Sequence, residues 1–153
     1  MKKIGKRGEM KRTPIKRKSK SETAKLKEEI QRLLREIVIK RDGKCIRCNI
    51  PVGTGGVIFQ ADHLITRSNS ATYADSRLVV CVCRNCHYWK SVGANSRKNQ
   101  YDDLVKKKIS KERVKLWERC EKESWQPKST RANDWKLHIL ALSQELERLK
   151  GWG

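Results

Sequence analysis

The sequence has no long apolar run: no window approaches 18 apolar residues, and no hydrophobic stretch follows the basic N-terminus. We therefore expect neither a membrane-spanning helix nor a secretory signal, and we expect a cytoplasmic protein. Acidic residues are also few, with 17 Asp and Glu against 37 Lys and Arg and a formal net charge of +20. This excess attracts polyanions, so nucleic acid is the first expected partner and an acidic membrane surface the second.

Aromatic residues make up only 6% of the chain and hydrophobic residues 37%, whereas 35% are charged. A chain of 153 residues has room for one domain of ordinary size with appendages. Its core should be modest and should depend on a staple such as a bound metal. Six cysteines without a secretory signal favour metal thiolates over a disulfide framework.

Two Cys-x-x-Cys pairs stand out, Cys45 with Cys48 and Cys83 with Cys86. Four thiolates at this spacing can hold one zinc ion tetrahedrally, as a closed structural site does. Cys81 could replace Cys83 as a ligand. However, Cys83-x-x-Cys86 matches the first pair, so we expect Cys81 to pack inside its strand.

Asp62 and His63 lie between the two pairs, and His87 directly follows the last cysteine. A zinc site that already has four sulfur ligands does not need them, so they are available for a second, catalytic metal. The alternative is that one of these histidines replaces a cysteine in the zinc site. His138 is distant from the motif along the chain and is expected to be structural.

The N-terminal part of the chain divides into an arm and a helix. Residues 1–20 hold ten Lys or Arg against Glu9 alone, which predicts a disordered basic arm that lies along phosphates or is a solvated tail. Residues 21–42 form an amphipathic pattern that predicts a helix, with Ser19 and Glu22 as a capping box and Gly43 after its end. Its apolar stripe consists of Leu26, Ile30, Leu33, Leu34 and Ile37.

Residues 43–97 are expected to form a strand over 57–61, a polar loop over 65–77, a strand over 78–83 and a helix over about 84–92. This α+β pattern with a zinc clamp is the outline of a ββα-metal fold. Residues 98–153 are expected to be helical over 100–108, 111–122 and 133–150, with a break at 125–127 and Asn133 as an N-cap. The last helix carries an apolar stripe that predicts core packing or a dimer seam: Trp135, Ile139, Leu142, Leu146 and Leu149.

The order Cys-x-x-Cys, Asp-His, Cys-x-x-Cys-His, with Lys90 three residues later, resembles the zinc-containing HNH (ββα-metal) endonucleases. The basic N-terminal region, the stretch Ile39-Lys-Arg-Asp-Gly-Lys-Cys-Ile-Arg-Cys48 and the helical tail are similar to the phage lambda NinG/Rap recombination proteins. Phage Holliday-junction resolvases with a four-cysteine zinc are also similar. The motif match covers residues 45–90.

This resemblance implies roles for individual residues. Asp62 and His87 would hold a catalytic Mg²⁺ or Mn²⁺, His63 would be the general base, and the four paired cysteines would bind structural zinc. The family usually has an asparagine that braces the loop of the catalytic histidine; Asp75 is the candidate here and Asn69 the fallback.

The resemblance also implies a phage- or prophage-encoded endonuclease that acts on DNA in the bacterial host. Its substrates would include branched recombination intermediates, and it would not act at a membrane. A homodimer would supply the two active sites that symmetric cutting requires. A non-catalytic zinc-ribbon protein that binds nucleic acid is the alternative.

Overall fold

The computed structural model describes residues 20–93, 95–123 and 132–151, and within them the fold mixes helices with one two-stranded antiparallel sheet. This confirms an α+β composition. In chain order the elements are α1 (Glu22–Asp42), β1 (Phe59–His63), the 3-10 helix η1 (Ser76–Leu78), β2 (Val79–Cys83), α2 (Arg84–Val92), α3 (Asn95–Lys108), α4 (Lys111–Glu123) and α5 (Ala132–Lys150). The predicted arm and the predicted break at 125–127 lie outside the described residues, apart from Lys20.

Helix α1 is the support on which the hairpin rests. Ser21 is its N-cap, because the Ser21 hydroxyl accepts a hydrogen bond from the backbone N–H of Ala24. The predicted capping box was therefore misplaced, and Ser19 itself lies outside the described residues. Gly43 ends the helix as predicted, with a φ of 64° that glycine tolerates without a steric penalty. Most of the predicted stripe is buried.

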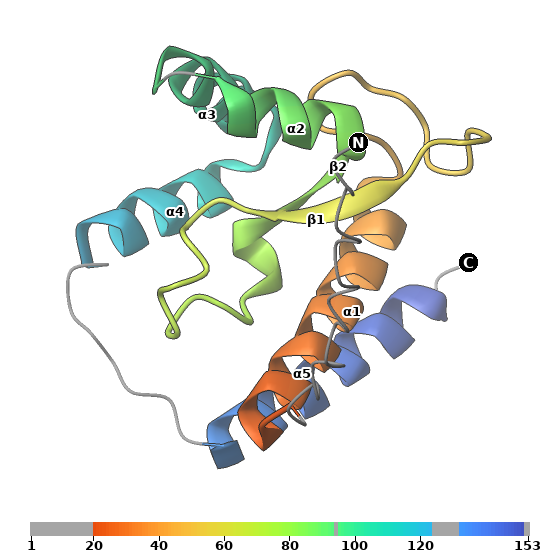
Figure 1. The fold of residues 1–153 in the computed structure, drawn as a ribbon, viewed down its shortest axis with the longest axis vertical. Helices are drawn as coiled ribbons and strands as arrows, with labels where there is room; N and C mark the ends of the chain where they lie inside the picture. The colour runs from red at the N-terminus through yellow and green to blue at the C-terminus, as the bar shows by residue number, and fades with distance from the viewer. Residues whose placement is uncertain (1–19, 94, 124–131, 152–153) are drawn as a thin grey trace, which may run out of the picture.

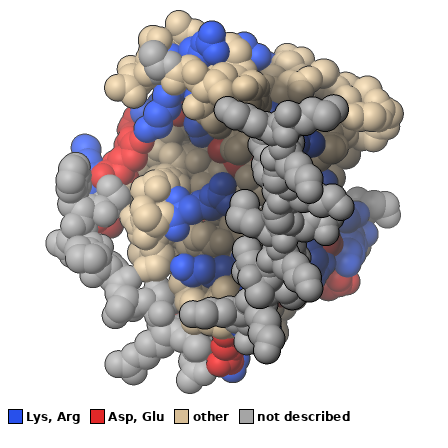
Figure 2. Space-filling model, viewed as in Figure 1, with Lys and Arg blue, Asp and Glu red and all other residues tan. Residues whose placement is uncertain are grey.

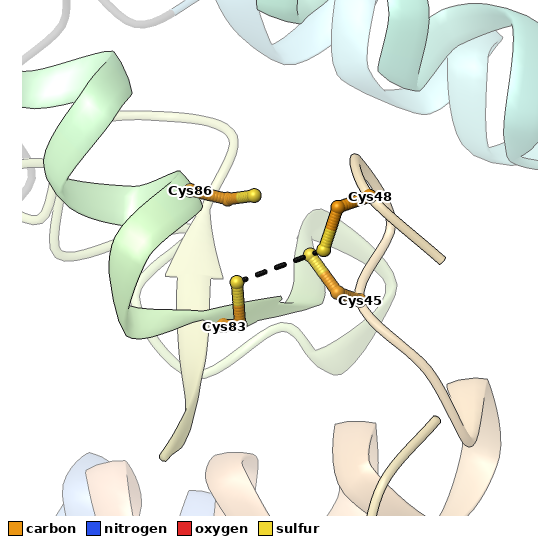
Figure 3. Close-up of side chains that lie close together, drawn as sticks. All are labelled: Cys45, Cys48, Cys83 and Cys86. Carbon is orange, nitrogen blue, oxygen red and sulfur yellow. Dashed lines mark hydrogen bonds between the residues drawn. The ribbon is translucent and has the colours of Figure 1, made fainter. Parts of the chain in front are cut away.

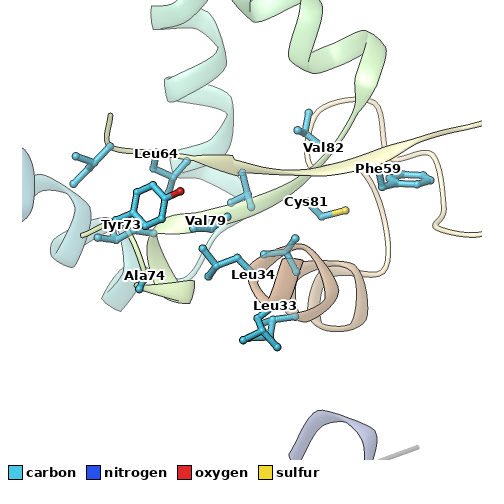
Figure 4. Packing of buried hydrophobic residues seen from close by; sticks show 14 of the residues in the cluster. Leu33, Leu34, Phe59, Leu64, Tyr73, Ala74, Val79, Cys81 and Val82 are labelled. Carbon is cyan, nitrogen blue, oxygen red and sulfur yellow. The ribbon is translucent and has the colours of Figure 1, made fainter. Parts of the chain in front are cut away.

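The hairpin pairs β1 with β2 from Phe59 opposite Cys83 to His63 opposite Val79. The predicted first strand was placed two residues too early, because the Val57 N–H bonds to the Thr54 carbonyl in a turn and the ladder continues through His63. Every residue of β2 is buried. Val79 and Cys81 face α1 in Figure 4, whereas Val82 points to the opposite side.

Charged side chains satisfy the open edges of this short sheet, which would be marginally stable alone. On the β1 edge, Arg35 Nε donates to the Phe59 carbonyl at 2.8 Å. On the β2 edge, Asp42 accepts the Cys81 N–H at 2.9 Å. The Val79 carbonyl accepts from both Arg41 and Arg113, at 2.8 and 2.9 Å. The backbone groups of the hairpin are thus paired with side chains from α1 and α4.

Helices α1 and α5 are far apart in the sequence but pack side by side, as Figure 1 shows. Trp135, Leu142 and Leu146 are buried, so the predicted stripe on α5 is mainly packed inside the chain. The helix begins at Ala132, so Asn133 lies within it and is not its N-cap.

The other helices lie close to their predicted places. Helix α2 matches its prediction, α3 starts five residues earlier than Gln100, and α4 extends to Glu123. Of the helices that the structure describes, none is both long and apolar enough to cross a membrane. In Figure 2, Lys and Arg side chains lie across the middle of one face, with acidic side chains mostly toward its edges.

Candidate metal centres

The four predicted cysteines converge from separate elements (Figure 3): Cys45 and Cys48 from the loop after α1, Cys83 from the end of β2, and Cys86 from the first turn of α2. All four Sγ atoms lie within 4.8 Å of one another, and those of Cys48 and Cys83 are 3.8 Å apart. Sulfurs bonded at about 2.3 Å to one tetrahedral zinc lie about 3.8 Å apart. The donor set therefore fits one metal ion such as zinc.

A tight turn presents the first cysteine pair. The Asn49 N–H bonds to the Cys45 carbonyl at 3.0 Å, and the Cys45 N–H bonds to the Ile50 carbonyl at 2.9 Å. Asn49 takes the left-handed conformation, with a φ of 61°, which asparagine adopts more readily than most residues. Lys108, at the end of α3, donates to the Ile46 carbonyl at 2.7 Å and to Asn49 Oδ1 at 3.0 Å, and so fixes the turn from outside.

The cluster has its own electrostatic surroundings. Burial raises the pKa of Cys45, but hydrogen bonds from the backbone of Cys48, Cys83 and Arg47 outweigh it and bring the pKa down to about 7. Arg47 also donates to Cys86 Sγ at 3.6 Å. Cys81 is fully buried outside the cluster, and burial raises the pKa of its thiol to about 12. The six cysteines are thus divided into four candidate ligands, buried Cys81 and Cys120 on α4.

Asp62 lies at a second centre, on the face of the hairpin opposite α1. Because it pairs with Val80 across the sheet, its side chain points away from α1 toward α2 and α3. Its side chain is only 6% exposed, with Lys90 Nζ 3.1 and 2.8 Å from its two carboxylate oxygens and His87 Nε2 3.5 Å from Oδ1. Burial alone raises the pKa of Asp62, but the hydrogen bond to His87 and the charge of Lys90 keep it below its ordinary value. Asp62 is therefore a buried carboxylate anion.

Tyr101 closes this centre from α3. Lys90 Nζ lies 4.7 Å from the centre of the Tyr101 ring. The Tyr101 hydroxyl is buried and has no hydrogen-bond partner in the described part of the chain. Burial, and then the negative charge of Asp62, raise the pKa of Tyr101. A buried polar atom without a partner is costly, and the acceptor beside the Tyr101 hydroxyl is the carboxylate of Asp62.

His63 faces the other side of the hairpin, toward α1. Its Nε2 lies 3.0 Å from the Tyr73 carbonyl and 3.4 Å from Gln31 Nε2. A carbonyl only accepts hydrogen bonds, so the shorter contact favours the tautomer with the proton on Nε2 and leaves Nδ1 as the basic nitrogen. The amide nitrogen of Gln31 is also a donor, so in this tautomer it makes no hydrogen bond to Nε2. Burial lowers the pKa of His63 despite the hydrogen bond to Tyr73. Burial therefore favours the neutral imidazole, the form that can accept a proton.

A groove of about 620 Å³ is lined by His87 and by Gln31, the residue whose side chain lies 3.4 Å from His63 Nε2. Three arginines also line it, Arg32 and Arg35 from α1 and Arg67 from the loop after β1. Arg32 is paired with Glu29 and Glu36. The groove is therefore a basic depression between α1, β1 and α2 that suits an anionic ligand.

Asp75, the candidate for bracing the loop of His63, lies at the start of η1. Its carboxylate caps η1 by accepting the Arg77 N–H at 3.0 Å, and it also pairs with the Arg77 guanidinium at 2.7 Å. Asn69 holds the loop after β1, with its side-chain oxygen accepting the Ala71 N–H at 3.1 Å. The direct contact to the His63 ring from this loop comes from the Tyr73 carbonyl. His138 on α5 packs beside Trp135, with ring centres 6.0 Å apart.

Three residues of these centres had no role assigned from the sequence: Lys90, Tyr101 and Arg47. Lys90 had a usable signal, because residues three apart on a helix share a face and His87 was already a candidate. Tyr101 and Arg47 had none, because they reach the centres only through tertiary packing. Comparison of this chain with protein-family models, with curated proteins and with solved structures finds no match.

Proposed function

We propose that this protein is a metal-dependent endonuclease of the HNH type that hydrolyses DNA phosphodiester bonds, with a structural zinc in the four-cysteine cluster. One observation carries the proposal: His87 Nε2 on α2 lies 3.5 Å from Asp62 Oδ1 on β1. His63, the residue after Asp62, points to the opposite face of the hairpin. A carboxylate and an imidazole so placed would supply two ligands to one divalent ion, which would stabilise negative charge on a phosphate. The order of hairpin, α2 and cysteine cluster supports the ββα-metal core that this proposal requires.

The chain's own residues would share the work of hydrolysis. His63, with its proton on Nε2, accepts a proton from the attacking water at Nδ1. Asp62 and His87 would hold Mg²⁺ or Mn²⁺, which would supply stabilisation of the charge on the leaving 3′ oxygen. The arginines of the groove favour a phosphate backbone there. The net charge of +20 favours DNA as the partner.

A second function is favoured by a specific contact. Lys90 already neutralises Asp62, as it would in a zinc-stabilised nucleic-acid-binding protein without catalysis.

The two functions predict different results in a nicking assay on supercoiled plasmid. Because EDTA also competes for zinc, the control without Mg²⁺ should be prepared by dialysis, with zinc content checked in both samples. Nicking that requires Mg²⁺ or Mn²⁺ and is lost in Asp62→Asn supports the nuclease.

A second experiment identifies which DNA structure is the substrate. A panel of linear duplex, flap, four-way-junction and single-stranded DNA would separate a general nuclease from one that acts on branched recombination intermediates. Preferential cutting of flaps or junctions supports the second. Equal rates on all duplex substrates would contradict it. If no substrate is cut under conditions where the protein holds zinc and binds DNA, the binding function is the correct one.

A further inference from the structure

Lys90 forms an ion pair with Asp62, the carboxylate that would bind the proposed divalent ion. Its Nζ lies 2.8 Å from Asp62 Oδ2 and 3.1 Å from Oδ1, so the ammonium bridges both oxygens. We propose that Lys90 is a placeholder cation, which neutralises Asp62 in the metal-free protein and competes with a divalent ion for it. The inference rests on the proposed function for the assignment of Asp62 and His87 as the ligands.

Burial makes this competition strong. The side chain of Asp62 is 6% exposed and that of Lys90 16%, so water screens the pair little. A buried carboxylate without a cation is costly, which explains why the metal-free site needs Lys90. An ion held by Asp62 and His87 would share that carboxylate with an ammonium, and two cations at one buried anion repel each other. Lys90 therefore lowers the affinity of the site for divalent ions.

Tyr101 reduces the cost of loosening the pair between Lys90 and Asp62. Lys90 Nζ already lies 4.7 Å from the centre of the Tyr101 ring, and an aromatic face attracts a cation. The Tyr101 hydroxyl, buried and without a partner among the described residues, can then donate to the Asp62 carboxylate in place of Lys90. The Tyr101 ring thus attracts the ammonium whether or not it is bonded to Asp62, and the Tyr101 hydroxyl offers the carboxylate a replacement hydrogen bond. The bonds lost by moving Lys90 are partly recovered.

Mn²⁺ binding to the zinc-loaded protein, followed without DNA by the electron paramagnetic resonance signal of free Mn²⁺, tests this role. Lys90→Met removes the charge and keeps the length of the side chain, so it should bind Mn²⁺ at least about tenfold more tightly than wild type. Lys90→Arg keeps the charge and should bind no more tightly than wild type. Lys107→Met, on the exposed face of α3, is the matched control and should behave as wild type.

The site of the ion is checked by Asp62→Asn in the Lys90→Met background, which should abolish the added binding. Unchanged or weaker Mn²⁺ binding in Lys90→Met would overturn the proposal, as would added binding that survives Asp62→Asn. If Lys90→Met does not fold, Lys90→Gln takes its place, because it keeps a donor without the charge. If folded Lys90→Gln then binds Mn²⁺ no more tightly than wild type, the proposal is overturned in the same way.

The outcome is separable from that of the proposed function. Tighter Mn²⁺ binding in Lys90→Met, together with no DNA cleavage by any variant, would support the placeholder and contradict the nuclease. Cleavage that depends on Mg²⁺, together with no change in Mn²⁺ affinity, would support the nuclease and contradict the placeholder. Binding and cleavage are therefore measured on the same preparations.

Discussion

The guanidinium of Arg47 lies 3.9 Å from the centre of the Trp89 ring, so a residue of the first cysteine turn stacks on the helix that carries Cys86. The same guanidinium donates to Cys86 Sγ at 3.6 Å. Four thiolates on one zinc carry a net negative charge, which a neighbouring cation offsets. Arg47 therefore connects the two halves of the cluster by both stacking and charge.

Replacing Arg47 should loosen the cluster without removing a ligand. We expect Arg47→Gln to lower the free energy of unfolding by about 1–2 kcal/mol, from the lost stacking and hydrogen bond to sulfur. Zinc should also transfer faster to a chromogenic chelator. The matched control is Arg84→Gln, an exposed arginine at the start of α2. Equal zinc-release rates for the two variants would contradict a role of Arg47 at the cluster.

Loss of a ligand should have a larger effect. We expect Cys45→Ser and Cys86→Ser to give unfolded or aggregated protein, because a modest core loses the metal that joins its parts. Cys120→Ser should keep one zinc per chain, since Cys120 lies on α4 outside the cluster. Elemental analysis and thermal unfolding measure both. Soluble Cys45→Ser protein that unfolds cooperatively would show that the cluster is dispensable.

Much of the fold could be predicted from the sequence because its helices follow local rules. The apolar periodicity of α1 and α5 and the stop at Gly43 depend only on nearby residues. The limits of β1 could not be predicted as well, because pairing with Val79 and Cys83 decides where the ladder begins and ends. Local propensity favoured Val57, but that residue is held in a turn.

The ligands of the candidate zinc site could be predicted from the sequence, but the surroundings of Asp62 could not. Cysteine spacing identified four residues that the fold then brings together. By contrast, the contact between Asp62 and Lys90 depends on how α2 is rotated over the hairpin, and the position of Tyr101 depends on how α3 returns across it. These are properties of packing between distant segments. A single sequence carries no local pattern for them.

The packing of α5 also changes what the dimer hypothesis predicts. Leu142 is 3% exposed within the chain, whereas Leu140 is 56% exposed. Leu142→Asp should therefore destabilise the monomer by at least about 3 kcal/mol, because it buries an unpaired charge. Leu140→Asp should change stability by less than about 0.5 kcal/mol, as exposed substitutions usually do. Urea unfolding separates these effects.

The same pair of variants tests the predicted homodimer by size-exclusion chromatography. An apolar dimer seam on α5 would use the large hydrophobic residues that are exposed there, Leu137 and Leu140. If wild type is a dimer through this helix, Leu140→Asp should elute as a monomer while remaining folded. A monomeric wild type at micromolar concentration would remove this version of the dimer.

The N-terminal arm is tested by deletion of residues 1–20. The deletion should weaken DNA binding without sequence preference and flatten its salt dependence, because each neutralised phosphate contributes about −0.9 to the slope of log K against log salt. Titrations at several salt concentrations measure the slope. If it does not change, the arm is a solvated tail.

The decisive prediction concerns His63. If His63 is the general base, His63→Ala should keep its zinc, fold and DNA affinity while cleavage falls by roughly 10²- to 10⁴-fold, the range typical of a removed base. Asp62→Ala and His87→Ala should also lose cleavage, but through the divalent ion, so high Mn²⁺ should restore part of their activity. High Mn²⁺ should not restore His63→Ala, because the missing group accepts a proton and holds no metal.

Zinc content and nicking rate measured on the same His63→Ala preparation distinguish three roles. Loss of zinc would make His63 a ligand, although the four cysteine sulfurs already form a complete donor set within 4.8 Å. Intact zinc with wild-type cleavage would make it a bystander and refute the proposed mechanism. Intact zinc with cleavage lost would make it the base, because its ring nitrogen bonded to the Tyr73 carbonyl leaves the other to take the proton.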